Sequence, residues 1–336
     1  MHPRTARLLR VVAAVSVVSA AIGLVFAAAQ GGRSAPDLLV GAVQGTLSGT
    51  LIALLEITLQ GRLAPWMRKL PVLGALALRT VLYAAILTTT ALLRERAAAV
   101  YAPAMTMAHV SAVELVVGMA ISLIINFIFV LRRLLGPRTL VALAIGRYQR
   151  PREEERVVLF MDVVGSTELA HRVGDRRFHE FLNRLATDVA DPVLETAGEI
   201  YRYVGDEIIV TWPVAAGVKV AACLECVLRV AEVLHARRTG YERDFGTAPR
   251  FRFALHAGTL IVGEMGDVKR EIVMLGDTMN TAARIEDVAR ETGDAILISQ
   301  ALADRLPLPP GVRLRGLGPV PLRGRGTLAL AAVEVG

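Results

Sequence analysis

Two aspartates stand where the chain leaves apolar, strand-like runs. Asp162 ends the run "RVVLFMD", and Asp206 follows Gly205 at the turn between two β-rich arms in "EIYRYVGDEIIVTW". Each aspartate alone is typical of a cap or a turn. If the first run pairs beside this hairpin, the two carboxylates meet at one end of a sheet and repel unless they are protonated or bridged by cations. Hard oxygen ligands select Mg²⁺ or Mn²⁺, and paired ions of this kind drive in-line phosphoryl chemistry.

Two further stretches offer groups for a nucleotide. Gly165, Ser166 and Thr167 lie at an expected helix start, where backbone N–H groups bind phosphate oxygens. Asn280 and Arg284 are four residues apart in "LGDTMNTAARIEDVAR", so they share one helical face. An amide and a guanidinium on one face suit a ribose and a charged phosphate, although this motif by itself would be read as an exposed polar stripe.

Four motifs in order and spacing resemble the catalytic domain of class III adenylate and guanylate cyclases: "FMDVVGST", "YRYVGDEIIV", "FALHAGTLIVGEMG" and "LGDTMNTAARIE". The resemblance covers about residues 150–336. It implies that Asp162, Asp206 and the carbonyl of Val163 bind Mg²⁺ or Mn²⁺, two ions per active site. It also implies that Asn280 orients the ribose and that Arg284 stabilises charge on the α-phosphate. In this family the metal ligands and the Asn–Arg pair come from two different domains, which implies a head-to-tail homodimer with two equivalent sites.

The sequence departs from the family where the purine base is selected. Adenylate-type members commonly have Lys three residues before the hairpin Gly and Asp or Thr seven residues before the Asn, whereas this chain has Arg202 and Val273. Valine cannot hydrogen-bond a base edge, and the pair does not match the Glu–Cys type of guanylate forms either. ATP is the favoured substrate, with a guanylate or dual-specificity cyclase as the alternative. In "PLRGRGTLAL", Arg323 and Arg325 are candidates for binding the triphosphate, and a solvated loop is the other interpretation.

The elements that position these groups follow from the hydrophobic pattern. Strand-like and helix-like runs alternate over 156–336, which predicts an α/β domain. The resemblance to the cyclases implies that this domain has their ferredoxin-like fold. A linker at 136–155 is indicated by a Gly-Pro break and by Pro151. Cys223 and Cys226 lie in an apolar helical run, where buried packing is favoured over metal or redox chemistry.

The first 135 residues are dominated by Ala, Leu, Val and Ile and predict a membrane domain with about four transmembrane helices, near 10–29, 38–60, 72–93 and 111–131. Arginines before the first span, between the second and third, and after the fourth place both termini and the catalytic domain in the cytoplasm by the positive-inside rule. We therefore expect a multi-pass protein of the cell (inner) membrane. A cleaved signal peptide at 1–29 is the alternative for the first span.

Charged residues inside the spans suggest one specific contact. Glu56 and Arg79 fall at similar depth in adjacent antiparallel spans, so they either pair or reach separately to the interface.

The net charge of +7 does not indicate nucleic-acid binding, because basic and aromatic residues are not interleaved.

The apolar spans and the resemblance to the cyclases together predict a membrane-anchored homodimeric adenylate cyclase, a phosphorus-oxygen lyase for signal transduction. A catalytically silent cyclase-like membrane receptor is a further alternative. A transporter is disfavoured by the few polar groups at the midplane of the spans.

Overall fold

The computed structural model describes residues 3–29, 34–61, 63–67, 70–101, 112–322, 324 and 326–335. The chain divides into two compact units, Met1–Leu140 and Val141–Gly336. The division falls inside the segment expected to be a linker, whose second part belongs with the second unit.

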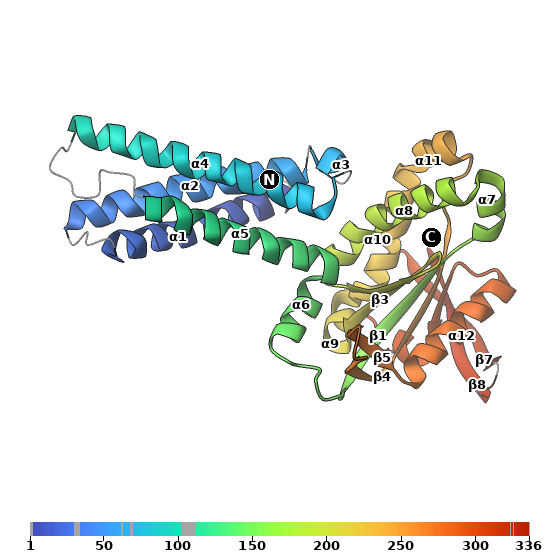
Figure 1. The fold of residues 1–336 in the computed structure, drawn as a ribbon. Coiled ribbons are helices and arrows are strands. Elements are labelled where there is room, and N and C mark those ends of the chain that lie inside the picture. The colour runs from blue at the N-terminus through green and yellow to red at the C-terminus, as the bar shows by residue number, and fades with distance from the viewer. Residues whose placement is uncertain are drawn as a thin grey trace. The chain divides into compact units, whose positions relative to one another are not determined.

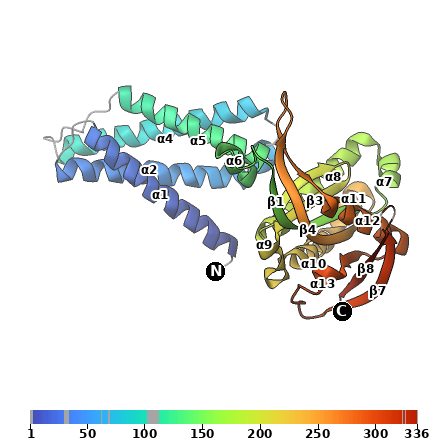
Figure 2. The same cartoon turned by 90° about the horizontal axis from the view of Figure 1, so that it is seen from below.

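Among the described residues, the first unit contains the helices α1 (Pro3–Ala29), α2 (Ala35–Gln60), α3 (Ala64–Met67), α4 (Val72–Tyr101) and α5 (Ala112–Leu135). In the part of the chain that is described, three helices are long and apolar enough to cross a membrane, over Val12–Ala29, Ala35–Leu59 and Val72–Arg96. The fourth expected span corresponds to α5, in which the described residues include an apolar helical section at Val116–Ile128. Figures 1 and 2 show α2, α4 and α5 running alongside one another.

Glycines allow α1 and α2 to approach closely, as small residues do in membrane helix pairs. A Cβ on Gly45 would lie 2.1 Å from the carbonyl oxygen of Ser19, and one on Gly41 would lie 2.6 Å from that of Gly23. Of the two alternatives for Glu56 on α2 and Arg79 on α4, the structure shows the pair: Arg79 Nε lies 3.1 Å from Glu56 Oε1, with 9% and 12% of the two side chains exposed. The Tyr83 hydroxyl donates to the same carboxylate oxygen at 2.5 Å.

The second unit is built on a sheet of order β2-β3-β1-β4-β6-β8-β7, with β5 paired to β4 beside this path. Helices cover both faces of the sheet (Figures 1 and 2). The strands are β1 (Arg152–Val163), β2 (Glu199–Val204), β3 (Glu207–Pro213), β4 (Phe251–Met265), β5 (Glu271–Leu275), β6 (Ile296–Ser299), β7 (Val312–Leu322) and β8 (Gly326–Val335). The helices are α6 (Pro137–Ala144), which contains the unit boundary, α7 (Ser166–Val173), α8 (Asp175–Glu195), α9 (Val214–Val218), η1 (Lys219–Ala221), α10 (Ala222–Ala236), α11 (Arg238–Phe245), α12 (Asp277–Thr292) and α13 (Gln300–Ala303).

The central strand β1 is buried on both faces because helices cover both. Val157, Leu159 and Met161 pack in the core under α8 and α10, whereas Val158 and Phe160 pack in the core under α12. Cysteines 223 and 226 of α10 are free and buried in the first of these cores, as expected. Asp162 is two residues after Phe160, so its side chain lies on the side of β1 that faces α12.

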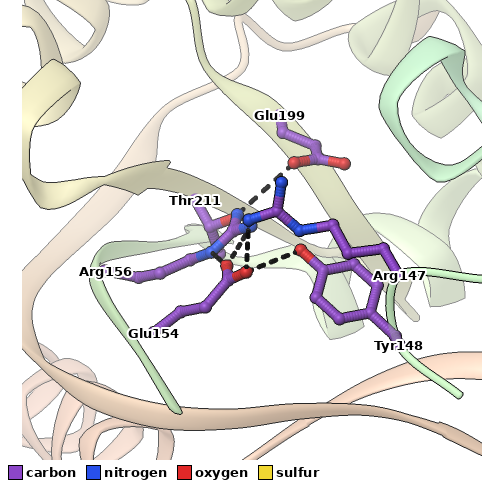
Figure 3. A network of polar contacts seen from close by, with 6 residues as sticks. All are labelled: Arg147, Tyr148, Glu154, Arg156, Glu199 and Thr211. Atoms are coloured by element: carbon purple, nitrogen blue, oxygen red, sulfur yellow. Dashed lines mark hydrogen bonds and ion pairs between the residues drawn. The ribbon is translucent and has the colours of Figure 1, made fainter. Parts of the chain in front are cut away.

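The segment before β1 is tied to the sheet by a polar network (Figure 3). Glu154 accepts hydrogen bonds from the Tyr148 hydroxyl at 2.9 Å and from Arg147 at 3.0 Å. Its other oxygen accepts from Arg156 at 3.0 and 2.8 Å. Arg156 also donates to groups on the two neighbouring strands, Thr211 at 3.1 Å and Glu199 at 3.4 Å. Burial would raise the pKa of Glu154, but the bonds from Arg156 and Tyr148 hold it below its usual value.

Candidate active site

Asp162 lies at the end of β1, between β3 and β4, and only 9% of it is exposed. Met161 pairs with Ile208 of β3, and Asp162 itself pairs with Arg252 of β4. Asp206 follows Gly205, whose φ of 62° is left-handed, in the turn between β2 and β3. This pairing places the turn beside the end of β1, as the sequence predicted. Burial first, and then the charge of Asp206, raise the pKa of Asp162.

Two guanidiniums contact Asp162. Arg252 donates to its Oδ2 at 3.1 Å, and Arg290 of α12 lies 3.5 Å from the same oxygen. Arg290 also donates to Glu286 at 2.5 Å. The positive charges of Arg290 and Arg252 lower the pKa of Asp162. Burial and the charge of Asp206 raise it by more, so the pKa stays above its usual value.

Two further carboxylates complete the cluster. Glu207 comes directly after Asp206, and burial followed by the charge of Glu286 raises the pKa of Glu207 to about 7. Glu207 Oε1 is buried without a hydrogen-bond partner among the described residues. Burial also raises the pKa of Glu286, with Asp162 adding to the rise. The end of the sheet therefore carries more negative charge than its two arginines balance.

Sequence reasoning did not identify Arg252, Glu207, Glu286 or Arg290. Glu286 and Arg290 are four apart, so they share a face of α12, and that spacing was visible in the sequence. The packing of α12 on β1 and β4 brings Glu286 and Arg290 to Asp162, and the pairing of β1 with β4 brings Arg252; no local pattern shows either arrangement.

The donor set at this end of the sheet fits a hard divalent cation. Asp162 and Asp206 are oxygen ligands with surplus negative charge, and Val163 supplies the next backbone carbonyl on β1. Within the described ranges, no cluster of three or more His, Cys, Asp or Glu side chains has the geometry of a metal site. Asp162, Asp206 and the carbonyl of Val163 are the groups that would hold the ion.

The expected phosphate-binding stretch is a helix start. Gly165, with φ 73°, is the N-cap residue of α7, and Ser166 and Thr167 begin that helix. The amide of Val164 is occupied by the carbonyl of Arg250 at 2.8 Å. The remaining N–H groups of the first turn are those that can bind a phosphate.

Asn280 and Arg284 lie on α12 but are not brought to Asp162. Asn280 is exposed, and Arg284 pairs with Asp287 on its own helix at 3.0 Å. At 100° per residue, the Asn280–Arg284 face lies about 120° around α12 from the face of Glu286 and Arg290. In one chain, Asn280 and Arg284 therefore lie on a different face of α12 from the residues that contact Asp162, and Asp287 lies between them, 3.0 Å from Arg284 and 3.8 Å from Arg290.

The expected base-selecting positions lie on β2 and β5. Arg202 pairs with Glu271 rather than with the position of Val273, with 2.7 Å between Nη2 and Oε2. Val273 lies opposite Gly263 in the ribbon formed by β4 and β5. Arg323 and Arg325 lie outside the described residues.

The profile of the adenylate and guanylate cyclase catalytic domain matches residues 148–334. The chain therefore belongs to the adenylate and guanylate cyclase family. It is 43% identical to Adenylate cyclase 2 of Rhizobium meliloti (strain 1021) over 66% of this chain and 61% of that protein. It is 28% identical to Adenylate cyclase 1 of the same organism over 54% of this chain and 27% of that protein. The chain thus spans less than two thirds of the length of these relatives.

Among solved structures, a bacterial light-regulated adenylyl cyclase matches with a TM-score of 0.56 and 18% identity, over 67% of this chain and 66% of that one. At this identity the match shows the fold. The expected architecture, apolar helices followed by a class III cyclase domain, is confirmed.

Proposed function

We propose that this protein is a membrane-anchored adenylate cyclase that converts ATP to 3′,5′-cyclic AMP and pyrophosphate. The observation that carries the proposal is the surplus of carboxylate charge around Asp162 and Asp206 at the end of β1. The family match and a 43% identical relative named as an adenylate cyclase support the same activity.

In the proposed reaction the 3′-hydroxyl oxygen of the ribose attacks the α-phosphorus, its proton passes to water, and the bond between the α-phosphorus and pyrophosphate breaks. Mg²⁺ or Mn²⁺, two ions per site, would be held by Asp162, Asp206 and the carbonyl of Val163, and would supply charge stabilisation at the reacting oxygens. The N–H groups at the start of α7, at Gly165 to Thr167, bind phosphate oxygens. Arg323 and Arg325 remain candidates for the same triphosphate.

The other half of the site orients the nucleotide. Asn280 holds the ribose by hydrogen bonds, and Arg284 stabilises the negative charge that develops on the α-phosphate. For Arg284 to act, it exchanges its contact with Asp287 for the phosphate. Because the Asn280–Arg284 face points away from Asp162, these groups serve the metal ligands of a second chain in a head-to-tail homodimer.

The apolar helices anchor the enzyme as a multi-pass protein of the inner membrane. The arginines that flank the expected spans favour a cytoplasmic catalytic domain. This is the compartment that holds ATP and that keeps the free cysteines reduced.

The full chain, purified in detergent or nanodiscs, should form cyclic AMP and pyrophosphate from ATP with Mg²⁺ or Mn²⁺. The assay compares ATP and GTP at saturating metal, with the Asp162→Ala variant as the blank. Cyclic GMP as the main product would favour the guanylate alternative. No product from either nucleotide would favour a silent receptor.

A further inference from the structure

An acidic and a basic side chain meet from two strands that are not neighbours in the sheet. β3, β1 and β4 separate β2 from β5 in the order of pairing. Even so, Arg202 Nη2 of β2 lies 2.7 Å from Glu271 Oε2 of β5. The Tyr201 hydroxyl also accepts a hydrogen bond from the backbone N–H of Met274 at 3.0 Å. Two independent contacts thus hold β5 against β2.

A β-bulge in β2 makes this meeting possible. Ile200 pairs with Val210 and Arg202 pairs with Ile209, so Tyr201 is the extra residue. Ile209 packs in the core under α12, and directly opposed residues share a face of the sheet. Arg202 therefore projects on the α12 side. Without the bulge it would stand opposite Ile208, which packs in the other core.

Glu271 belongs to the strand that delivers the nucleotide-orienting residues. β5 runs through Gly276 into α12, which carries Asn280 and Arg284. Glu271 and Val273 are two residues apart and so lie on the same face of β5. The acid that Arg202 lacks at position 273 is thus supplied from position 271.

We propose that Glu271 is a specificity-determining residue of the proposed cyclase site, and that its carboxylate accepts a hydrogen bond from the 6-amino group of adenine while Arg202 donates to ring N1. This inference rests on the proposed function and names the group that reads the base. Adenine presents a donor beside an acceptor on this edge, and a carboxylate beside a guanidinium is its complement. Arg202 has five N–H donors, so its bond to Glu271 leaves others for the base.

The surroundings keep Glu271 ready to accept. Lys269 Nζ lies 2.5 Å from Oε1, and this contact first, with the charges of Lys269 and Arg202, lowers the pKa of Glu271. An ionised carboxylate repels a 6-carbonyl oxygen, which hypoxanthine and guanine carry in place of the amino group. The pair therefore favours ATP over ITP and GTP.

The test is kcat/KM for ATP, ITP and GTP with the full chain and its Glu271→Gln and Glu271→Ala variants. Glu232→Ala is the matched control, because Glu232 is an exposed glutamate on α10, which packs on the face of the sheet opposite α12. We expect the preference for ATP over ITP to fall at least about tenfold in both Glu271 variants and to stay unchanged in the control.

An unchanged preference in Glu271→Gln, or an equal loss for all three nucleotides, would overturn the inference while leaving the proposed function in place. If the wild-type chain cyclises no nucleotide, the proposed function fails, and binding decides the inference separately. In that case ATP and ITP are compared as competitors of a fluorescent N-methylanthraniloyl-ATP. The Glu271 variants should again lose the preference for ATP. If ATP and ITP displace the fluorescent nucleotide from the wild-type protein equally well, the inference about Glu271 is wrong.

Discussion

At the scale of single residues, Asp162 combines burial, a neighbouring aspartate and contact with two arginines. Its charge is disfavoured by burial and by Asp206, so a cation placed between the two carboxylates relieves both effects. We predict that Asp162→Ala or Asp206→Ala lowers cyclic AMP formation at least about a hundredfold, because charge stabilisation of the reacting oxygens is lost. Initial rates at saturating Mg²⁺ measure the effect.

The control for this prediction is Asp175→Ala, because Asp175 is an exposed aspartate at the start of α8. It should keep wild-type activity, and all three variants should unfold at similar temperatures. An active Asp162→Ala or Asp206→Ala protein would contradict the proposed metal site.

The two cysteines give a residue-scale prediction about reactivity and pH. Burial raises the pKa values of Cys223 and Cys226 to about 12. Because only the thiolate is nucleophilic, iodoacetamide at pH 8 should leave both unmodified in the native protein and modify both in denaturant. Since the folded pKa values are raised, their contribution to stability is full below about pH 9 and is lost as the pH rises toward 12. Mass spectrometry after alkylation checks this, and rapid native labelling would show that α10 opens.

The site residues that could be predicted from the sequence are those whose positions follow from a local sequence pattern. Asp162 and Asp206 stand at a strand end and a hairpin turn, features that the sequence itself encodes. Arg252 joins them only through strand register, and Glu286 and Arg290 join them only through the packing of α12. Glu271 was missed for the same reason, because a one-residue bulge decides which face Arg202 takes.

At the scale of elements, the segment before β1 depends on one acid. Glu154 binds Arg147, Tyr148 and Arg156, and the Arg156 side chain is only 7% exposed. We predict that Glu154→Ala destabilises the second unit by about 3 kcal/mol, because it leaves a buried guanidinium with weaker partners. Unfolding of the full chain in urea, with stability taken from the second transition if the two units separate, measures this loss.

The neighbouring Glu155 provides the control. It pairs with Arg305 at 2.8 Å, but the two side chains are 53% and 40% exposed. Glu155→Ala should therefore cost less than about 1 kcal/mol. Equal effects of the two substitutions would mean that the network in Figure 3 contributes no more than a surface ion pair.

The elements themselves were largely predictable because their patterns are strong. The strands before Asp162 and around Asp206, and the helix of Asn280, appear where apolar periodicity placed them. The start of β1 at Arg152 could not be predicted, because the charged sequence "REEER" is typical of a linker. Pairing of Arg152–Glu155 with Thr259–Val262 of the long β4 extends the strand through this charged run.

At the scale of the whole molecule, the proposed enzyme requires two chains. Each chain owns both halves of the site, but the Asn280–Arg284 face of α12 lies about 120° from the face that contacts Asp162. An isolated catalytic unit would therefore hold metal ligands and nucleotide-orienting residues that do not serve one substrate. Activity should depend on protein concentration wherever dimers dissociate.

Mixing two inactive variants tests this arrangement directly. Asp162→Ala removes a metal ligand and Arg284→Ala removes the phosphate-stabilising group, so each homodimer has two damaged sites. In a heterodimer of the two variants, one site combines the intact metal ligands of one chain with the intact Arg284 of the other, and the second site carries both defects. Random pairing of equal amounts makes half of the dimers mixed, so about a quarter of wild-type activity should return. Asp162→Ala mixed with Asp206→Ala should restore nothing, because both changes damage the same half of the site. If heterodimers form, as co-purification through two different tags would show, and Asp162→Ala with Arg284→Ala remains inactive, then each site lies within a single chain and Arg284 must reach Asp162 by a movement of α12.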